Sequence, residues 1–156
     1  MASSTTRWLR LVISDMGPRL PLWFAAFWWV SLSCIGFLVV PMLFAYLPTP
    51  AQAGGMAARL FAAQTWVSIT CAFVLLMHTG SSRSSSGDSD AHGALIFIVS
   101  GMLLALLSEY AIAPRIVLRE NLRLWHSVGS LMYLLQWGCA AVTFWKLSMP
   151  GKDTPS

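Results

Sequence analysis

The sequence has very little charge. Of its 156 residues only 10% are Asp, Glu, Lys or Arg, whereas an ordinary soluble domain has about 25%. Together with 56% hydrophobic residues, this scarcity argues against a water-soluble globular protein. The basic residues also form no face with interleaved aromatics, so nucleic acid is not expected as a partner.

The few charges are spaced so that four long stretches carry none: residues 20–58, 60–82, 91–108 and 124–145. A helix needs about 20 mostly apolar residues to cross a bilayer core of about 30 Å. We therefore predict one all-α transmembrane domain over residues 1–156, an integral membrane four-helix bundle with the lipid bilayer as its partner. The expected spans are residues 22–46, 56–77, 93–113 and 124–145, and the expected flexible polar loop is residues 80–92.

The positions of lysine and arginine predict the orientation, because these residues are enriched in cytoplasmic loops. With the N-terminus inside, the cytoplasmic basic residues are six: Arg7, Arg10, Arg19, Arg83, Lys146 and Lys152. The external ones are four: Arg59, Arg115, Arg119 and Arg123. We therefore expect both termini to be cytoplasmic, in a multi-pass protein of the cell inner membrane.

Catalytic motifs are missing from the sequence. It has no HExxH, no GxSxG and no phosphate-cradling glycine loop. Its three cysteines, Cys34, Cys71 and Cys139, lie within the apolar spans without CxxC spacing, so no disulfide framework is expected. We predict no enzyme, no catalytic residues and no cofactor.

Metal binding is a distant alternative. Thiolates select Cu(I), and all three cysteines lie near span centres, which keeps a copper-associated membrane subunit open. Buried free cysteine is more often a small hydrophobic residue, however, and no metal ligand is assigned. A haem held by His78 and His126 is disfavoured because these residues lie near opposite membrane surfaces, about 25 Å apart at the helical rise per residue.

Glu109 is the one formal charge within a span, which makes it a functional candidate by default. At about 1.5 Å per residue it lies about 9 Å outward of the midplane, and His126 lies about 12 Å outward on the next, antiparallel helix. We expect the two side chains to meet, with Gln64 at a similar depth. The predicted outer-leaflet polar cluster is Arg59, Gln64, Glu109, Arg123 and His126.

This cluster has two interpretations. In the structural one, Glu109 neutralises a neighbouring arginine and holds the bundle together. In the functional one, the cluster binds a proton, a cation or a small molecule, since perturbed ionisable pairs gather at functional sites. The sequence leaves both open.

Two stretches resemble a family of small four-span membrane proteins. The first is FLVVPMLFAYLPTPAQAGGMAARLF at residues 37–61, and the second is residues 112–136. In the second stretch the matching positions are Pro114, Arg115, Arg119, His126 and Tyr133, whereas Ser127 replaces the usual glycine and Gly129 the usual serine. The family is grouped with transmembrane protein 205 and, in bacteria, is described as a domain of unknown function. The resemblance implies a four-helix membrane protein and no settled activity.

Three functions follow as hypotheses. The first is a non-enzymatic accessory or interaction subunit that packs in a larger membrane complex or a homo-oligomer. Its candidate close-approach pairs are Ser33 with Gly36, Ala58 with Ala62, and Gly138 with Ala141. The second is a small transporter, or a cation-handling or proton-handling membrane protein, with a site at Glu109 and His126. The third and most distant is a copper-associated or haem-associated subunit.

Overall fold

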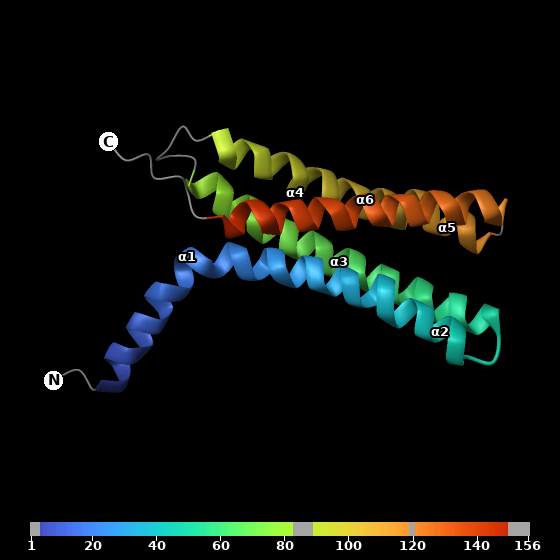
Figure 1. Cartoon of the computed structure of the whole chain (residues 1–156), viewed down its shortest axis with the longest axis horizontal. Helices are drawn as coiled ribbons and strands as arrows, with labels where there is room; N and C mark the ends of the chain where they lie inside the picture. Colours follow the sequence, from blue (N-terminus) through green and yellow to red (C-terminus); the bar gives the residue numbers. More distant parts are fainter. Residues whose placement is uncertain (1–3, 83–88, 119–120, 150–156) are drawn as a thin grey trace.

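The chain folds into two antiparallel helical hairpins (Figure 1). The computed structural model describes residues 4–82, 89–118 and 121–149. The first hairpin consists of α1 (Ser4–Ser33), the π-helix η1 (Cys34–Val39), α2 (Val40–Tyr46) and α3 (Pro50–Ser82). The second consists of α4 (Ser89–Leu107), the π-helix η2 (Ser108–Ile112), α5 (Ala113–Val117) and α6 (Leu122–Ser148). The predicted all-α fold class is confirmed.

Four helical stretches are long and apolar enough to cross a membrane: Arg19–Tyr46, Pro50–Gly80, Gly93–Ile116 and Arg123–Ser148. Each contains one predicted span in full. The prediction of a loop over residues 80–92 is wrong at both ends, since α3 continues to Ser82 and α4 begins at Ser89. Serine and glycine cost at most about 1 kcal/mol each in a helix, so an established helix continues through a few of them. The middle of the predicted loop, residues 83–88, lies outside the described residues.

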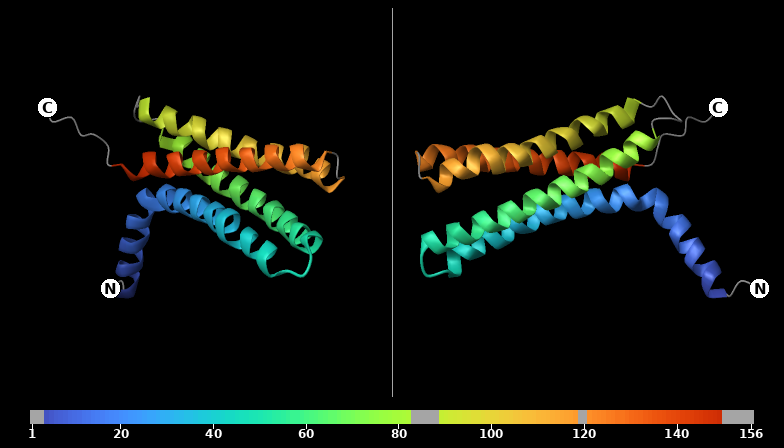
Figure 2. Two further views of the ribbon diagram at one scale, coloured as in Figure 1. Left: turned by 45° about the vertical axis from the view of Figure 1, so that its right-hand side comes forward. Right: turned by 180° about the vertical axis from the view of Figure 1, so that it is seen from behind.

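The beginning of α1 and the end of α6 lie at the same end of the molecule, as four crossings require (Figure 1). The first part of α1 bends away from the bundle (Figures 1 and 2), and the sequence of α1 includes Pro18 and Pro21. Proline removes a helical N–H donor and clashes with the preceding turn, which explains the bend. A cytoplasmic location of this end remains a prediction from the basic residues.

The two hairpins pack tightly at the end that holds the chain termini and diverge toward the other end (Figures 1 and 2). We call the tight part the packed half. Its core consists of Ala25, Trp28, Leu32, Cys71, Ala72, Leu75, Ile98 and Ala140. Gly101 permits this packing, because a Cβ atom there would lie 2.6 Å from Cη2 of Trp28 and 3.3 Å from Cβ of Cys139.

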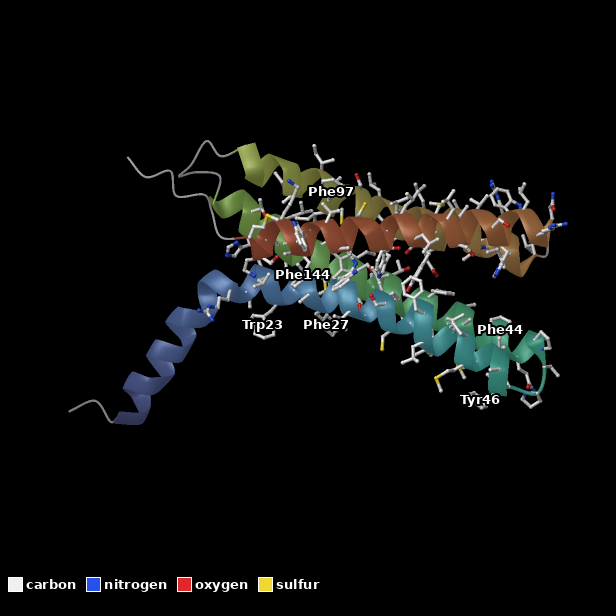
Figure 3. The ribbon with its side chains drawn as sticks, viewed as in Figure 1. Trp23, Phe27, Phe44, Tyr46, Phe97 and Phe144 are labelled. Carbon is white, nitrogen blue, oxygen red and sulfur yellow. The ribbon has the colours of Figure 1, made fainter. Side chains whose placement is uncertain are left out.

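Large aromatic side chains cover the outside of the bundle. Trp23 is 67% exposed and Phe27 58%, and both point away from the other helices (Figure 3). Phe44 and Tyr46 are exposed at the far end of the same hairpin (Figure 3). This apolar, aromatic surface suits contact with lipid, and the aromatic residues near the helix ends suit the membrane interfaces.

The first helix of each hairpin is irregular at a corresponding position. The π-helix η1 is followed by Pro41, and η2 is followed by Pro114. A proline cannot donate to the carbonyl four residues earlier and its ring crowds that carbonyl, so the preceding turn widens. Single π-helical turns inside α-helices are frequent at functional sites. The part of the bundle beyond these turns, which we call the open half, is where the hairpins diverge.

Candidate functional site

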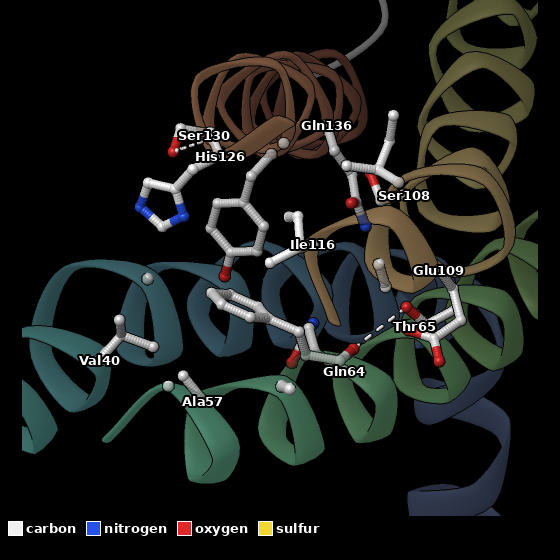
Figure 4. Close-up of a pocket in the computed structure, with 18 of the residues that line it drawn as sticks. Val40, Ala57, Gln64, Thr65, Ser108, Glu109, Ile116, His126, Ser130 and Gln136 are labelled. Atoms are coloured by element: carbon white, nitrogen blue, oxygen red, sulfur yellow. Dashed lines mark hydrogen bonds between the residues drawn. The ribbon is translucent and has the colours of Figure 1, made fainter. Parts of the chain in front are cut away.

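A cavity of about 560 Å³ lies between the hairpins in the open half (Figure 4). Its lining comes from η1, α2 and α3 of the first hairpin and from η2, α5 and α6 of the second. Apolar side chains such as Phe37, Val40, Phe61 and Ile116 form much of the wall. Its polar lining residues are Gln64, Thr65, Ser108, Glu109, His126, Ser130, Tyr133 and Gln136. Such a mixture of apolar walls and a few polar groups is typical of small-molecule sites.

Gln64 presents a free acceptor at the buried side of this cavity. The side chain is only 2% exposed, and its Nε2 donates to Ser31 Oγ at 3.0 Å. Ser31 Oγ itself donates to the carbonyl of Trp28 at 2.9 Å, so its oxygen is left to accept. The amide nitrogen of Gln64 is therefore directed at Ser31, and Oε1 has no hydrogen-bond partner.

A second buried amide joins the two hairpins. Gln136 Nε2 on α6 donates to Ser68 Oγ on α3 at 2.9 Å, and Gln64 Nε2 lies 3.5 Å from the same oxygen. Ser31, Gln64, Ser68 and Gln136 thus form a network that links α1, α3 and α6. Since buried polar groups in lipid are satisfied by other helices, this network fixes the inner boundary of the cavity.

Tyr133 forms another part of that boundary. Its hydroxyl donates to the carbonyl of Leu32 at 2.7 Å, and its ring meets that of Phe61 edge-on with centroids 5.2 Å apart. The ring packs directly against Gly36, where any Cβ atom would collide with Cε1 of Tyr133. Gly36 is therefore needed for this close approach between η1 and α6.

The structure brings three of the five predicted cluster residues to one cavity: Gln64, Glu109 and His126. The prediction that Glu109 and His126 meet is wrong, because they lie on opposite sides of the cavity (Figure 4). Depth along the membrane normal says nothing about direction around a helix. That direction depends on the wide turn η2, which contains Glu109, and on Asn121, whose left-handed φ of 40° precedes α6.

The two arginines of the predicted cluster do not line the cavity. Arg59 and Arg123 are both exposed, and long basic side chains place their charge in water or among lipid headgroups. Among the described side chains no basic group pairs with the Glu109 carboxylate within 4.0 Å. The expected neutralisation of Glu109 by an arginine is thus not found in the described part of the chain.

The cysteines are not gathered into one site. Cys71 is buried in the packed core, Cys34 is exposed, and Cys139 lies next to Gly101. Within the described residues no group of three or more His, Cys, Asp or Glu side chains is placed to hold a metal ion. The three thiols therefore do not form the copper site that their shared depth left open.

Five polar lining residues were missed from the sequence, namely Thr65, Ser108, Ser130, Tyr133 and Gln136. Ser108 is buried at its Oγ, which has no hydrogen-bond partner. Helical spacing would have pointed to others, because Ser130 and Tyr133 follow His126 by four and seven residues and so share its face of α6. Ser108 carries no such signal, since the π-helix η2 breaks the 3.6-residue period there.

Residues 23–124 match the family model described as Domain of unknown function (DUF4149). This match covers well over half of the chain. The chain belongs to this family. The matched region contains both π-helices, Gln64 and Glu109, and it ends just before His126. It carries no specific link to transmembrane protein 205, and no curated protein or solved structure matches the chain.

Proposed function

We propose that the chain is a non-enzymatic small-molecule transporter of the membrane whose binding site is the cavity of the open half. One observation carries the proposal. Within a membrane-spanning bundle, a cavity of about 560 Å³ is lined by Gln64, Glu109 and His126 and is closed toward the packed half. Polar and ionisable groups are costly inside a membrane, and they mark substrate and ion pathways.

The helix irregularities support the same proposal. Transporters commonly hold substrate where membrane helices are interrupted, and glycine or proline in corresponding positions of two halves points to such sites. Here η1 with Pro41 and η2 with Pro114 flank one cavity from the two hairpins. Because both turns are irregular, each hairpin has a point at which its outer part can change direction relative to its packed part.

The accessory-subunit hypothesis has less structural support. Of its three small-residue pairs, Gly36 packs against Tyr133 of the same chain and Ala58 lines the cavity. Gly138 is different, since a Cβ atom there would meet nothing within 4 Å. The face of α6 around Gly138 and Ala141 therefore stays a second candidate, as a contact for another membrane helix.

The cellular setting belongs to the proposal as well. We infer a location in the cell inner membrane with both termini in the cytoplasm, on the distribution of lysine and arginine. Kinship with transmembrane protein 205 is inferred from residues 37–61 and 112–136 alone. With these inferences, the open half faces away from the cytoplasm.

Two-sided access to the cavity tests the transporter function. Thr65 lines the cavity and is 8% exposed, so Thr65→Cys in a chain with Cys34, Cys71 and Cys139 replaced by alanine reports on its interior. Right-side-out and inside-out vesicles are treated with a membrane-impermeant methanethiosulfonate. A transporter alternates its access, so we expect modification from both sides at different rates. Modification from one side alone would overturn the transporter function.

The chain offers a matched pair of variants for the same assay. Gly54 lines the cavity and Gly55 does not, and a Cβ atom at either position meets nothing within 4 Å. Gly54→Leu therefore adds bulk inside the cavity without striking neighbouring atoms at its Cβ, whereas Gly55→Leu adds the same bulk outside it. We expect Gly54→Leu to slow modification of the thiol introduced by Thr65→Cys, and Gly55→Leu to leave the rate unchanged. Equal rates in both variants would contradict the cavity as the site of access.

A further inference from the structure

We propose that the cavity selects an organic cation with N–H donors on an apolar body, such as a protonated primary amine. This inference rests on the proposed function, because it names the substrate class of that same cavity. Three features carry it: a free buried acceptor, an acid with no basic partner among the described side chains, and aromatic walls.

The acceptor is Gln64 Oε1. It has no partner, although its residue is almost fully buried and lines the cavity. In this arrangement the donor Nε2 is directed at Ser31 Oγ, whose own hydrogen goes to the Trp28 carbonyl, so Oε1 is the atom of the amide that is left without a partner. Buried polar groups are nearly always hydrogen-bonded, so this oxygen requires a donor from a ligand or a water. A ligand that offers only acceptors leaves it unsatisfied.

The charge of the cavity points the same way. Among the described residues that line it there is one acid, Glu109, one histidine, His126, and neither lysine nor arginine. A charge among apolar side chains is stabilised by an opposite charge, and a cationic ligand supplies the one that Arg59 and Arg123 do not. An anionic ligand meets repulsion from Glu109 in surroundings where water screens poorly.

The route to Glu109 is not limited to the cavity. A second depression of about 450 Å³ is formed by Ala58, Glu109, Ala113, Pro114 and Leu118. Glu109 is half-buried and borders both hollows, so it is reached between α3 and α5 as well. An amphipathic cation can keep its apolar body in lipid while its charged group approaches by this side.

The walls suit the apolar body of such a ligand. Phe37, Phe44, Phe61 and Tyr133 all line the cavity. Aromatic faces attract cations as well as apolar groups, and the effect increases when water is excluded. The volume of about 560 Å³ lies in the range of about 300–1,000 Å³ that holds drug-sized ligands.

Four compounds with one phenylalkyl skeleton separate charge from hydrogen bonding. They are 3-phenylpropylammonium, its N,N,N-trimethyl derivative, 3-phenylpropanol and 4-phenylbutyrate. Binding to the purified full-length chain in detergent is measured by titration calorimetry. We expect the primary ammonium to bind at least about tenfold tighter than the alcohol and to exceed the trimethyl compound, since charge-assisted hydrogen bonds are the strongest available. The carboxylate is expected to bind most weakly.

Variants assign the selectivity to the proposed atoms. Glu109→Gln should lower the affinity for the ammonium about tenfold and leave that for 3-phenylpropanol within about twofold, whereas Glu109→Asp should keep the preference for the cation. Gly54→Leu should weaken the binding of all four compounds, whereas Gly55→Leu should leave their binding unchanged. The ligand series on the unaltered chain tests the proposal even if Glu109→Gln does not accumulate.

The possible outcomes separate this inference from the proposed function. If the alcohol or the carboxylate binds as tightly as the ammonium, cation selectivity is overturned while the cavity stands as a binding site. If the affinity for the ammonium is the same in Gly54→Leu as in the unaltered chain, the assignment of the cation to this cavity is overturned. If no compound binds, the substrate class is overturned, and two-sided modification of the Thr65→Cys variant then decides the transporter function separately.

Discussion

The packed half and the open half contain the same two hairpins, but the space between the hairpins is filled in one and hollow in the other. In the packed half, Gly101 and small residues such as Ala25 and Ala140 let the Trp28 ring fill the centre. In the open half, the helices turn apart beyond η1 and η2, and large side chains such as Phe44 stay partly exposed. The difference teaches that local helix geometry, rather than apolar composition, determines where this bundle is hollow.

The boundary between the halves is polar. Ser31, Gln64, Ser68 and Gln136 join three helices there, and Trp137 Nε1 donates to Ser33 Oγ at 2.8 Å just behind them. Helices in lipid gain little from apolar contact with one another, so interhelical hydrogen bonds and close packing hold them in place. This boundary keeps the packed half closed while the open half diverges.

The largest expected difference between the two halves is in the free energy of unfolding that is lost when one aromatic side chain is replaced by alanine in each. Trp28 is fully buried in the packed core, so Trp28→Ala should lower the free energy of unfolding by about 3–5 kcal/mol. Phe44 is 49% exposed at the cavity, and Phe44→Ala should cost less than about 1 kcal/mol. Thermal unfolding in one detergent measures both. Equal losses would show that the halves are packed alike.

Trp28→Phe is the control for that comparison. The indole Nε1 of Trp28 has no hydrogen-bond partner, so phenylalanine removes a buried unpaired donor while keeping an aromatic ring. We expect the free energy of unfolding of this variant to be much closer to that of the unaltered chain than that of Trp28→Ala. Removing an unpaired buried donor stabilises the folded chain, and this gain partly offsets the loss of packed volume. A loss as large as that of alanine would contradict the described surroundings of the indole.

An intermediate effect is expected where the halves meet. Gly36→Ala places a Cβ atom against the Tyr133 ring and should displace it, breaking the hydrogen bond to Leu32. Overpacking and the lost bond predict a loss of about 1–3 kcal/mol. Gly129→Ala is the control, since the nearest atom to its Cβ would be Cγ2 of Ile112 at 3.4 Å, which is close to an ordinary van der Waals contact. Similar unfolding temperatures for the two variants would disprove the special role of Gly36.

A smaller effect is expected in the polar boundary. A double-mutant cycle of Ser68→Ala and Gln136→Leu measures the coupling through their 2.9 Å hydrogen bond. Such bonds between membrane helices contribute about 0.6 kcal/mol on average and about 1.7 kcal/mol at most. We expect a coupling in that range from denaturation in mixed micelles. Strict additivity of the two single losses would show that the bond is not formed.

The smallest effect is expected at Gly138 in the packed half. Nothing lies within 4 Å of a Cβ atom there, so Gly138→Ala should change the free energy of unfolding by at most about 1 kcal/mol, toward greater stability. Gly101→Ala, one helix away, should instead destabilise. Size-exclusion chromatography of Gly138→Ala adds a test of the oligomeric state. If this face of α6 packs on the helix of another copy, the added methyl group should disrupt that contact and the oligomer should dissociate.

The sequence predicted the spans well because each is long and nearly free of charge. It also predicted that Gln64, Glu109 and His126 lie at one level, which the helical rise alone decides. It could not predict that Glu109 and His126 face each other across a hollow, because that depends on the direction around each helix after a π turn. The arginines were misplaced for another reason, since a shared depth does not reveal which side chains extend to the surface.

The two π-helices make the cavity sensitive to insertions and deletions. A π-helical turn takes about one residue more than an α-helical turn, so removing one residue from η2 would restore the regular period and close the wide turn that holds Ser108, Glu109 and Ile112 at the cavity wall, while the helix beyond it kept nearly the same orientation. The same holds for η1 and the segment that begins with Val40. The shape of the cavity wall therefore depends on the residue count between Ser33 and Pro41 and between Leu107 and Pro114 as well as on the identity of the wall residues.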